Sequence, residues 1–248
     1  MRVVIPSHKR SDRVLCKALL IDPIICVPKS QKASYERCNP GCEIVTHPDS
    51  VVGLIPKRNW IAKHFGDVFM VDDDVDCLKY LAASPGESSV IREPSKVMGI
   101  ITSLHDLAEM LDIHLYGFTP RYAPMMYEGT SFYSLSSMIT GCSYGVRPSK
   151  NVRWNEELKL KEDFWISCYI KYKERRVLTD LRYSFLQKGT FVSSGGLAAI
   201  RNQAEEQRSI LLMRKYFGES VRLKGAGNNG KEATRSRVQY NITVKFPF

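Results

Sequence analysis

Short apolar runs alternate with helical stretches through the first third of the chain. Four runs are short and rich in β-branched residues, which is typical of buried strands, and they cover residues 3–5, 24–27, 43–46 and 68–71. Helices are predicted between them, at residues 14–19, 31–37 and 55–65. Ser11 or Asp12 would cap the first of these helices. Strands that alternate with helices predict βαβ units and a parallel sheet.

The pattern of the second half is less regular. Strands are predicted at residues 90–91, 113–118, 139–146, 177–185 and 238–246. Helices are predicted at residues 94–111 and 198–217, and one more begins at residues 161–163. The segment 122–133 is rich in Met and Tyr and lacks clear periodicity, which is compatible with an active-site loop. Because the chain has no internal repeat and no low-complexity linker, we expect one domain over residues 1–248.

The strand predicted at residues 68–71 ends abruptly in acids. Asp72, Asp73, Asp74 and Asp76 lie within five positions, at the carboxyl end of a strand, where open α/β sheets bind ligands. Carboxylates this close repel one another unless a positive charge offsets them. Mg²⁺ or Mn²⁺ is a suitable partner, because both prefer carboxylate oxygen and accept phosphate oxygens as further ligands. The alternative is a solvated acidic turn. Asp76 would either reach a metal-bound water or cap the next turn.

The charge balance favours polyanionic partners. The chain has a net charge of +10 and a pI of about 9.2, which favours nucleic acid, an anionic membrane or phosphate-bearing substrates; a merely soluble basic protein is the alternative. One basic cluster is formed by Lys171, Lys173, Arg175 and Arg176. A second is interleaved with Gly and Asn, as expected for a flexible loop that contacts a phosphate backbone, and consists of Lys224, Lys231, Arg235 and Arg237.

The cysteines and the hydropathy predict a cytoplasmic protein without a membrane span. The seven cysteines include one isolated Cys38-x-x-x-Cys42 spacing and no paired motif, so reduced thiols are expected rather than a zinc site. No run of about 20 apolar residues occurs, so no membrane-spanning helix is expected. The apolar start at residues 1–6 is read as a strand rather than a signal peptide.

Four motifs carry a resemblance to a known fold. The sequences at residues 5–10 (Ile-Pro-Ser-His-Lys-Arg), 57–60 (Lys-Arg-Asn-Trp), 69–76 and 161–163 (Lys-Glu-Asp) resemble the GT-A glycosyltransferase fold. The resemblance covers about two thirds of the chain. The first three motifs are specifically similar to the TET-associated glycosyltransferases of bacteriophages, which are thought to place sugars on hydroxylated DNA bases.

The resemblance implies a fold, a reaction and partners. The fold would be α/β, with a GT-A-like, mostly parallel sheet flanked by helices. A nucleotide-sugar-binding half at residues 1–78 would precede a variable acceptor-side half at residues 79–248, which carries the basic C-terminal segment. The donor would be a nucleotide-sugar such as a UDP-sugar, and the acceptor a hydroxylated, for example 5-hydroxymethylated, pyrimidine in phage DNA within the host cytoplasm. A divalent metal is implied, whereas no membrane or obligate protein partner is.

The same resemblance implies residue roles on the donor side. Asp74 would bind the metal, and Asp72 and Asp73 would face the ribose or the donor sugar. Many metal-dependent members of the fold use a late His as a further ligand, but all five His of this chain lie at or before His114, so water or another group would replace it. The remaining donor-binding candidates, for which surface charge is the alternative, are Pro6, Ser7, His8, Lys9, Arg10, Arg58 and Asn59.

Catalysis and acceptor binding are assigned to the second half. If the configuration inverts, a group must deprotonate the acceptor hydroxyl; Asp163 is the first candidate and Glu162 the second. Both lie at a predicted helix N-terminus, where the helix dipole favours the ionised form, although ordinary first-turn acids also occur there. Gly195 and Gly196 would allow close approach of the backbone to a substrate. Aromatic residues that could stack on a sugar or an extruded base, or simply belong to the core, are Tyr122, Tyr127, Phe132, Tyr133 and Trp154.

Three alternatives remain open at this point. The same chemistry could serve a polysaccharide, lipid-linked sugar or protein acceptor. A nucleotidyltransferase of related fold would also use paired acids with a metal, but its Gly-rich first loop is missing here. A catalytically silent nucleic-acid-binding domain would not need four clustered acids.

Overall fold

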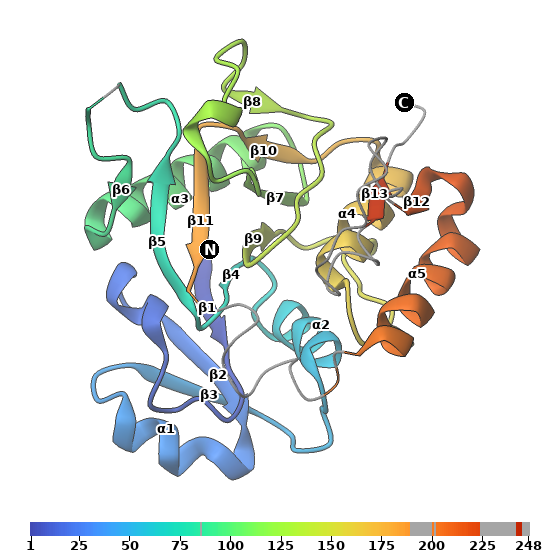
Figure 1. The fold of residues 1–248 in the computed structure, drawn as a ribbon. Coiled ribbons are helices and arrows are strands. Elements are labelled where there is room, and N and C mark those ends of the chain that lie inside the picture. The colour runs from blue at the N-terminus through green and yellow to red at the C-terminus, as the bar shows by residue number, and fades with distance from the viewer. Residues whose placement is uncertain (85, 189–199, 201, 224–241, 245–248) are drawn as a thin grey trace.

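A computed structural model describes residues 1–84, 86–188, 200, 202–223 and 242–244. Its main feature is an eight-stranded sheet in the order β3-β2-β1-β4-β9-β7-β10-β8 (Figure 1). The strands of this sheet are β1 (Arg2–Pro6), β2 (Ile24–Pro28), β3 (Glu43–His47), β4 (Val68–Val71), β7 (Leu115–Phe118), β8 (Tyr133–Ser134), β9 (Ser143–Val146) and β10 (Leu178–Asp180).

Two smaller sheets and five α-helices complete the described chain. One antiparallel sheet has the order β11-β5-β6, and β12 pairs with β13. These strands are β5 (Val75–Tyr80), β6 (Val90–Ile91), β11 (Tyr183–Gln187), β12 (Val221–Leu223) and β13 (Ile242–Val244). The helices are α1 (Lys32–Cys38), α2 (Leu54–Phe65), α3 (Pro94–Met110), α4 (Glu162–Glu174) and α5 (Gln203–Phe217), with the short 3₁₀ turns η1 (Leu15–Leu19), η2 (Lys29–Gln31), η3 (Pro124–Met126) and η4 (Gly218–Ser220).

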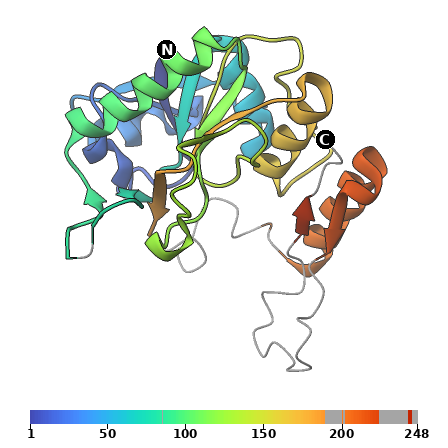
Figure 2. The same cartoon turned by 90° about the horizontal axis from the view of Figure 1, so that it is seen from above.

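Strand direction brings several loops to one edge of the main sheet. Strand β1 is parallel to β2 and β4, and β10 is parallel to β7. Strand β9 is antiparallel to both β4 and β7, so β4 and β7 run in the same direction. The ends of β1, β4, β7 and β10 therefore share one edge, which we call the carboxyl edge. In Figure 2 this edge faces away from the labelled N-terminus.

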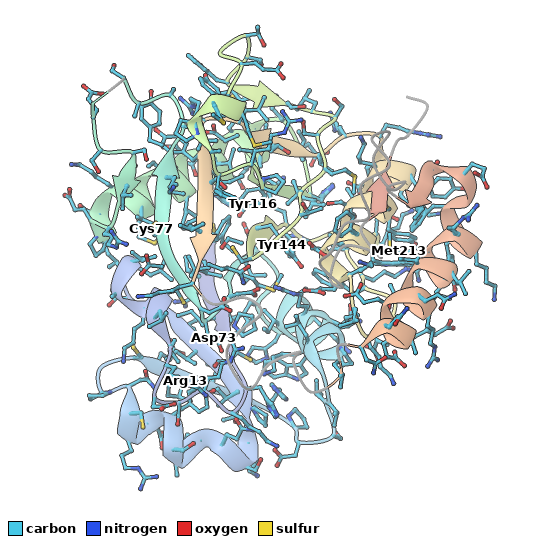
Figure 3. All side chains as sticks on the ribbon, viewed as in Figure 1. Arg13, Asp73, Cys77, Tyr116, Tyr144 and Met213 are labelled. Carbon is cyan, nitrogen blue, oxygen red and sulfur yellow. The ribbon has the colours of Figure 1, made fainter. Side chains whose placement is uncertain are left out.

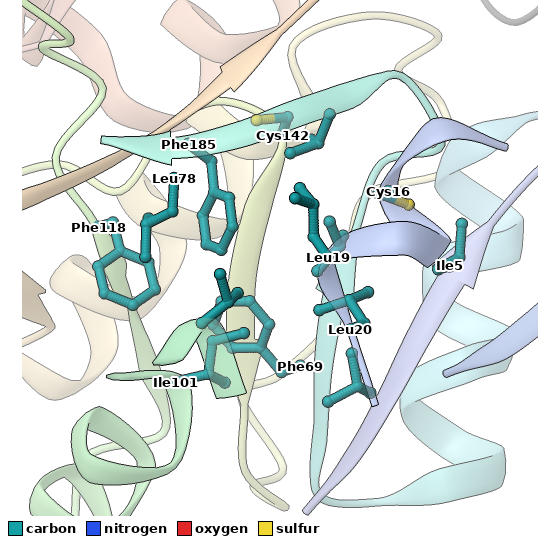
Figure 4. Close-up of a cluster of buried hydrophobic side chains, with 14 of the residues drawn as sticks. Ile5, Cys16, Leu19, Leu20, Phe69, Leu78, Ile101, Phe118, Cys142 and Phe185 are labelled. Carbon is teal, nitrogen blue, oxygen red and sulfur yellow. The ribbon is translucent and has the colours of Figure 1, made fainter. Parts of the chain in front are cut away.

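Alternation along the strands divides the core into two layers. Val3, Ile5 and Phe69 point to one face and pack with α3, η1 and the β5–β11 pair (Figure 4). Val4 and Met70 point to the other face and pack with α2, α4 and α5. This is the period of two expected for a strand with both faces buried. Fully apolar runs such as residues 68–71 are therefore explained.

Gly145 in β9 is required by its neighbour in the sheet. It lies opposite Tyr116 of β7, and a Cβ at this position would lie 2.1 Å from the Tyr116 ring. Tyr116 is fully buried. A glycine thus allows a large aromatic ring to cover the backbone of the antiparallel strand that separates β4 from β7.

The predicted α/β class, with a mostly parallel sheet flanked by helices, is confirmed. The order of the first four strands, with α1 and α2 between the later ones, also follows the prediction. All seven cysteines are free thiols. Within the described residues, no helix is long and apolar enough to cross a membrane.

Several predicted elements were wrong in detail. The segment after Ser11 and Asp12 is a 3₁₀ turn that begins at Leu15 without a side-chain cap, because its apolar residues pack under β5 rather than extend a helix. The strand predicted at residues 177–185 is two strands, β10 and β11, which belong to different sheets. Asp76 does not cap a turn; it lies within β5 and pairs with Arg92 at 2.6 Å.

Candidate functional site

The three acids that follow β4 are fixed through their backbone by three separate segments. The Asp72 N–H donates to the Cys142 carbonyl at 2.8 Å. The Asp73 carbonyl accepts from the N–H of Leu15, and the Asp74 carbonyl accepts from the N–H of Lys188. These partners come from the start of β9, from η1 and from the end of β11. The acidic turn is therefore an ordered part of the carboxyl edge (Figure 3, where Asp73 is labelled).

Asp73 orders the loop that follows β1. Its two carboxylate oxygens accept from Ser7 Oγ at 2.6 Å and Arg10 Nη1 at 2.7 Å. The Tyr35 hydroxyl lies 2.7 Å from Ser7 Oγ and accepts from the Arg10 N–H at 3.0 Å. Asp73 is only 5% exposed, so its carboxylate is used within the protein. The loop is therefore held in one shape beside the acids.

Asp72 is joined to the acids of α4 through one arginine. Arg58 of α2 is completely buried, and its Nη2 lies 2.9 Å from Asp72 Oδ1 and 3.5 Å from Glu162 Oε1. The guanidinium carbon lies 5.0 Å from the centroid of the Tyr144 ring. Burial raises the pKa of Asp72 to about 8, against the opposing effect of Arg58. Arg58 is thus enclosed between two acids and a ring, where a donor molecule does not reach it.

Asp74 is the acid of the turn best suited to a metal ion. Its Oδ1 accepts from Gln187 Nε2 at 2.8 Å, and its Oδ2 lies 3.5 Å from Arg10 Nη1. Burial raises the pKa of Asp74, so added positive charge would favour its ionised form. Within the described part of the chain, no group of three or more His, Cys, Asp or Glu side chains is arranged to hold a metal. A Mg²⁺ or Mn²⁺ ion bound at Asp74 would therefore take one carboxylate from the protein and its other ligands from phosphate and water.

Glu162 and Asp163 form the first turn of α4. The Asp163 Oδ2 accepts from the Gly141 N–H at 2.7 Å, which ties α4 to the segment before β9. Burial, and then the charge of Glu162, raise the pKa of Asp163 to about 6. Glu162 is buried against Arg58. The pair thus offers a carboxylate that is ionised at neutral pH and basic enough to accept a proton.

The other predicted donor residues divide into two groups. The backbone N–H of Lys9 donates to Gln31 Oε1 at 2.9 Å, while His8 Nδ1 lies 3.1 Å from Gln31 Nε2; both residues remain exposed at the carboxyl edge. Pro6 lies in β1 opposite Cys26. Asn59 faces away, since its amide exchanges hydrogen bonds with the Trp154 backbone at 2.9 and 2.8 Å.

Sequence reasoning did not single out several residues of the site. Lys57 is buried, donates from Nζ to the Ser7 carbonyl, and has a pKa lowered by burial to about 8. Its position directly before Arg58, in the motif at residues 57–60, could have marked Lys57 as a site residue. Tyr35 and Gln187 reach the site from distant parts of the sequence, and no local pattern marks them.

The acceptor-side candidates have mixed outcomes. Trp154 is buried in the core, whereas Tyr122, Phe132 and Tyr133 are exposed. Six further acceptor-side candidates lie outside the described residues. They are Gly195, Gly196, Lys224, Lys231, Arg235 and Arg237.

A separate cavity lies at the far end of the β5–β11 ladder. It has a volume of about 550 Å³, and Tyr80, Tyr183 and Arg182 are among its lining residues. Tyr80 pairs with Tyr183 at one end of the ladder, whereas Gln187 contacts Asp74 at the other. Tyr183 and Gln187 are four residue steps apart along β11, which corresponds to about 13 Å. The cavity is therefore distinct from the acidic turn.

Comparison with known proteins gives one family match. Residues 1–196 match the family model described as TET-Associated Glycosyltransferase. No curated protein matches the chain. Among solved structures, the crystal structure of S. aureus TarS 1-349 is similar, with 12% identity, a TM-score of 0.46, and coverage of 89% of this chain and 73% of that chain.

Proposed function

The chain belongs to the TET-associated glycosyltransferase family, and from this premise we propose that it transfers a sugar from a nucleotide-sugar to a hydroxylated pyrimidine base in phage DNA. The protein is a glycosyltransferase, so the nucleotidyltransferase and the silent binding domain are set aside. The observation that carries the proposal is the family match over residues 1–196, which includes both groups of acids. The proposed donor is a UDP-sugar, and the proposed acceptor is a 5-hydroxymethylated base in the cytoplasm of an infected cell.

The donor is proposed to bind at the acidic turn. Asp74 would hold Mg²⁺ or Mn²⁺, and a bound ion would offset the charge on the departing nucleoside diphosphate. Asp72 has a side chain that is 23% exposed, which leaves oxygen surface for hydroxyl groups of the donor. Asp73 would act through the ordered loop rather than by direct contact, since Ser7 and Arg10 occupy its carboxylate.

The acceptor hydroxyl is proposed to lose its proton to Asp163. In an inverting transfer, the acceptor oxygen bonds to the anomeric carbon while the bond from that carbon to the diphosphate breaks. The proton of the hydroxyl passes to the Asp163 carboxylate. The Gly141 N–H holds this carboxylate in place at 2.7 Å, and Arg58 fixes the neighbouring Glu162 relative to Asp72. The distance between the donor site at the acidic turn and the proton acceptor Asp163 would thus be constant.

Binding to DNA is proposed to be largely electrostatic. The net charge of +10 favours a polyanion, and the loops of the carboxyl edge present exposed Lys9, Arg13 and Lys188. The basic segment is proposed to contact phosphates through Lys224, Lys231, Arg235 and Arg237, with Gly195 and Gly196 close to the acceptor.

The test is incubation with a panel of sugar nucleotides and DNA that contains 5-hydroxymethylated pyrimidines, followed by nucleoside mass spectrometry. The expected product is a base whose mass is raised by one sugar residue. Unmodified DNA is the matched control, because it lacks the acceptor hydroxyl. Turnover of a polysaccharide or protein acceptor, with none of hydroxylated DNA, would overturn the proposed acceptor and leave the glycosyltransferase assignment intact.

A further inference from the structure

The segment at residues 122–135 concentrates exposed apolar surface. Of the 16 exposed large apolar side chains in the described residues, six lie in these 14 positions, and Met125 is 91% exposed. Isolated exposed apolar residues are ordinary, but a group of this kind marks an interaction surface. The six residues are Tyr122, Met125, Met126, Phe132, Tyr133 and Leu135.

Both arms of this segment are anchored to the end of β10. The Thr119 N–H donates to the Asp180 carbonyl at 3.0 Å, and the Leu181 N–H donates to the Phe132 carbonyl at 2.9 Å. Arg182 Nη2 donates to the Tyr133 hydroxyl at 2.7 Å, and its guanidinium lies 5.1 Å from the centroid of the Phe132 ring. Between the arms, η3 presents Met125 and Met126 on a short 3₁₀ turn. The segment therefore has a fixed base and an exposed apolar tip.

The segment lies on the same edge of the sheet as the acids. It follows β7 and contains β8, which lies four strand positions from β4 in the order β4-β9-β7-β10-β8. Four strand spacings correspond to about 19 Å. Figure 2 shows the yellow-green segment projecting from the carboxyl edge. An extended acceptor such as a duplex would reach the acids and this tip at the same time.

The carboxyl edge carries exposed cations in its other loops. Lys9, Arg13 and Lys188 are exposed there, whereas Arg121, directly before the segment, pairs with Glu128 within it at 3.8 Å. An apolar projection on an edge that also carries cations suits the apolar base stack and the charged backbone of a nucleic acid. Proteins that bend or open DNA insert Met, Phe, Leu or Pro side chains between bases in this way.

We propose that residues 122–135 form a wedge that enters the acceptor duplex and holds the hydroxylated base out of the stack. The inference rests on the proposed DNA acceptor. The acceptor atom is the oxygen of the 5-hydroxymethyl group, and bringing this oxygen to Asp163 would draw the base out of the duplex. Unstacking carries a free-energy cost that is smallest for a base already unpaired. The wedge would offset this cost by occupying the vacated space. The wedge would therefore increase the rate of transfer to duplex DNA and leave the rate of transfer to single-stranded DNA unchanged.

The test compares one variant on two forms of the same oligonucleotide. Met125→Ser with Met126→Ser removes the tip, and the exposure of these side chains keeps the fold intact. We expect kcat/KM on duplex DNA to fall by about tenfold or more, while kcat/KM on the single strand changes by less than about twofold, because unpairing costs a few kcal/mol only in the duplex. Met110→Ser is the matched control, since Met110 is 79% exposed at the opposite edge, and it should change neither value.

A second readout follows the DNA rather than the product. When 2-aminopurine is placed beside the hydroxylated base in the duplex, wild-type protein should increase the fluorescence of the 2-aminopurine, because the neighbouring base leaves the stack. The double variant should not cause this increase. Equal losses on duplex and single strand would overturn the wedge and assign the segment to general acceptor binding. The wedge would also be overturned if the double variant kept its duplex activity but lost dimerisation, which would assign the segment to a protein interface. Unchanged duplex activity with loss of binding to phosphatidylglycerol vesicles would instead assign it to a membrane surface. Failure of wild-type protein to glycosylate either DNA form would instead count against the proposed acceptor.

Discussion

The acids after β4 and the acids that open α4 are held in different ways. Each residue of the Asp72–Asp74 turn is tied to a different distant segment through its backbone, and Asp73 also orders the loop after β1. Glu162 and Asp163 lie on one helix, where the Asp163 carboxylate accepts from the Gly141 N–H and Glu162 contacts Arg58. The first group is a rigid platform, whereas the second depends on the placement of a single helix.

This difference suggests a division of labour. A diphosphate donor has a constant shape and charge, so a rigid group of acids can be prepared for it in advance. An acceptor hydroxyl needs one proton acceptor at the right distance, and a helix that is held at its first turn is enough to provide it. Arg58 joins the two groups of acids, because its guanidinium forms ion pairs with both Asp72 and Glu162.

Among the variants that test this difference between the two groups of acids, Asp74→Ala is expected to have the largest effect. We expect sugar transfer to be lost and Mn²⁺-dependent donor affinity to fall, because the proposed metal ligand is removed from the turn. The fold should persist, since Asp74 makes its backbone contact with Lys188 through a carbonyl that remains. Donor binding by calorimetry with and without Mn²⁺ measures the effect. Asp76→Ala is the control, because Asp76 only pairs with exposed Arg92; wild-type turnover by Asp74→Ala would disprove the metal assignment.

Asp163→Asn tests the second group of acids. Asparagine can still accept from the Gly141 N–H, but it cannot take a proton at neutral pH. We expect kcat to fall by about 10²–10⁴-fold while the donor dissociation constant is unchanged. Glu162→Gln is the paired variant and should have the smaller effect on kcat. If Glu162→Gln has the larger effect, the base is Glu162; if both lose less than about tenfold, a retaining mechanism that needs no base here is favoured.

Arg58→Met affects both groups at once. Methionine fills much of the buried volume but leaves Asp72 and Glu162 without their shared cation. Removal of one partner from a buried ion pair costs about 3 kcal/mol or more of stability, and we expect the lower end because Asp72 is 23% exposed. Denaturant unfolding measures this loss. Arg147→Met is the control, since Arg147 pairs with Glu109 at the opposite edge; it should lower stability without changing kcat or KM, whereas Arg58→Met should change both.

The same contrast explains what the sequence could predict. Before β4, α1 follows β2, α2 follows β3, and the 3₁₀ turn η1 follows β1, so local periodicity was sufficient to order the elements and to place Asp72–Asp74 at a strand end. Ser7 and Arg10 were assigned to the loop at the same edge, because they follow the first strand directly. Their hydrogen bonds to Asp73 and Tyr35 could not be read from the sequence, since the partners lie far along the chain.

The second half resisted prediction for a physical reason. Strand β9 is inserted antiparallel between β4 and β7, and β10 and β11 follow each other closely but join different sheets. Such pairings depend on contacts between distant residues, not on a local period. Arg58 illustrates the same limit: a cation near an acidic motif suggested donor binding, but only the packing against Tyr144 shows that it is enclosed.

The pH dependence of transfer is the smallest effect that we expect. It is also the most direct test of Glu162 and Asp163, the two acids in the first turn of α4. Burial and Glu162 raise the pKa of Asp163 to about 6, and a general base acts only when ionised. We therefore expect kcat, measured with saturating donor, to rise about tenfold per pH unit below this value and to level off above it. Since the charge of Glu162 contributes to the raised pKa, Glu162→Gln should move the midpoint to lower pH. A midpoint that moves upward, or a profile that is flat between about pH 5 and 8, would show that Asp163 does not accept the proton in the rate-limiting step.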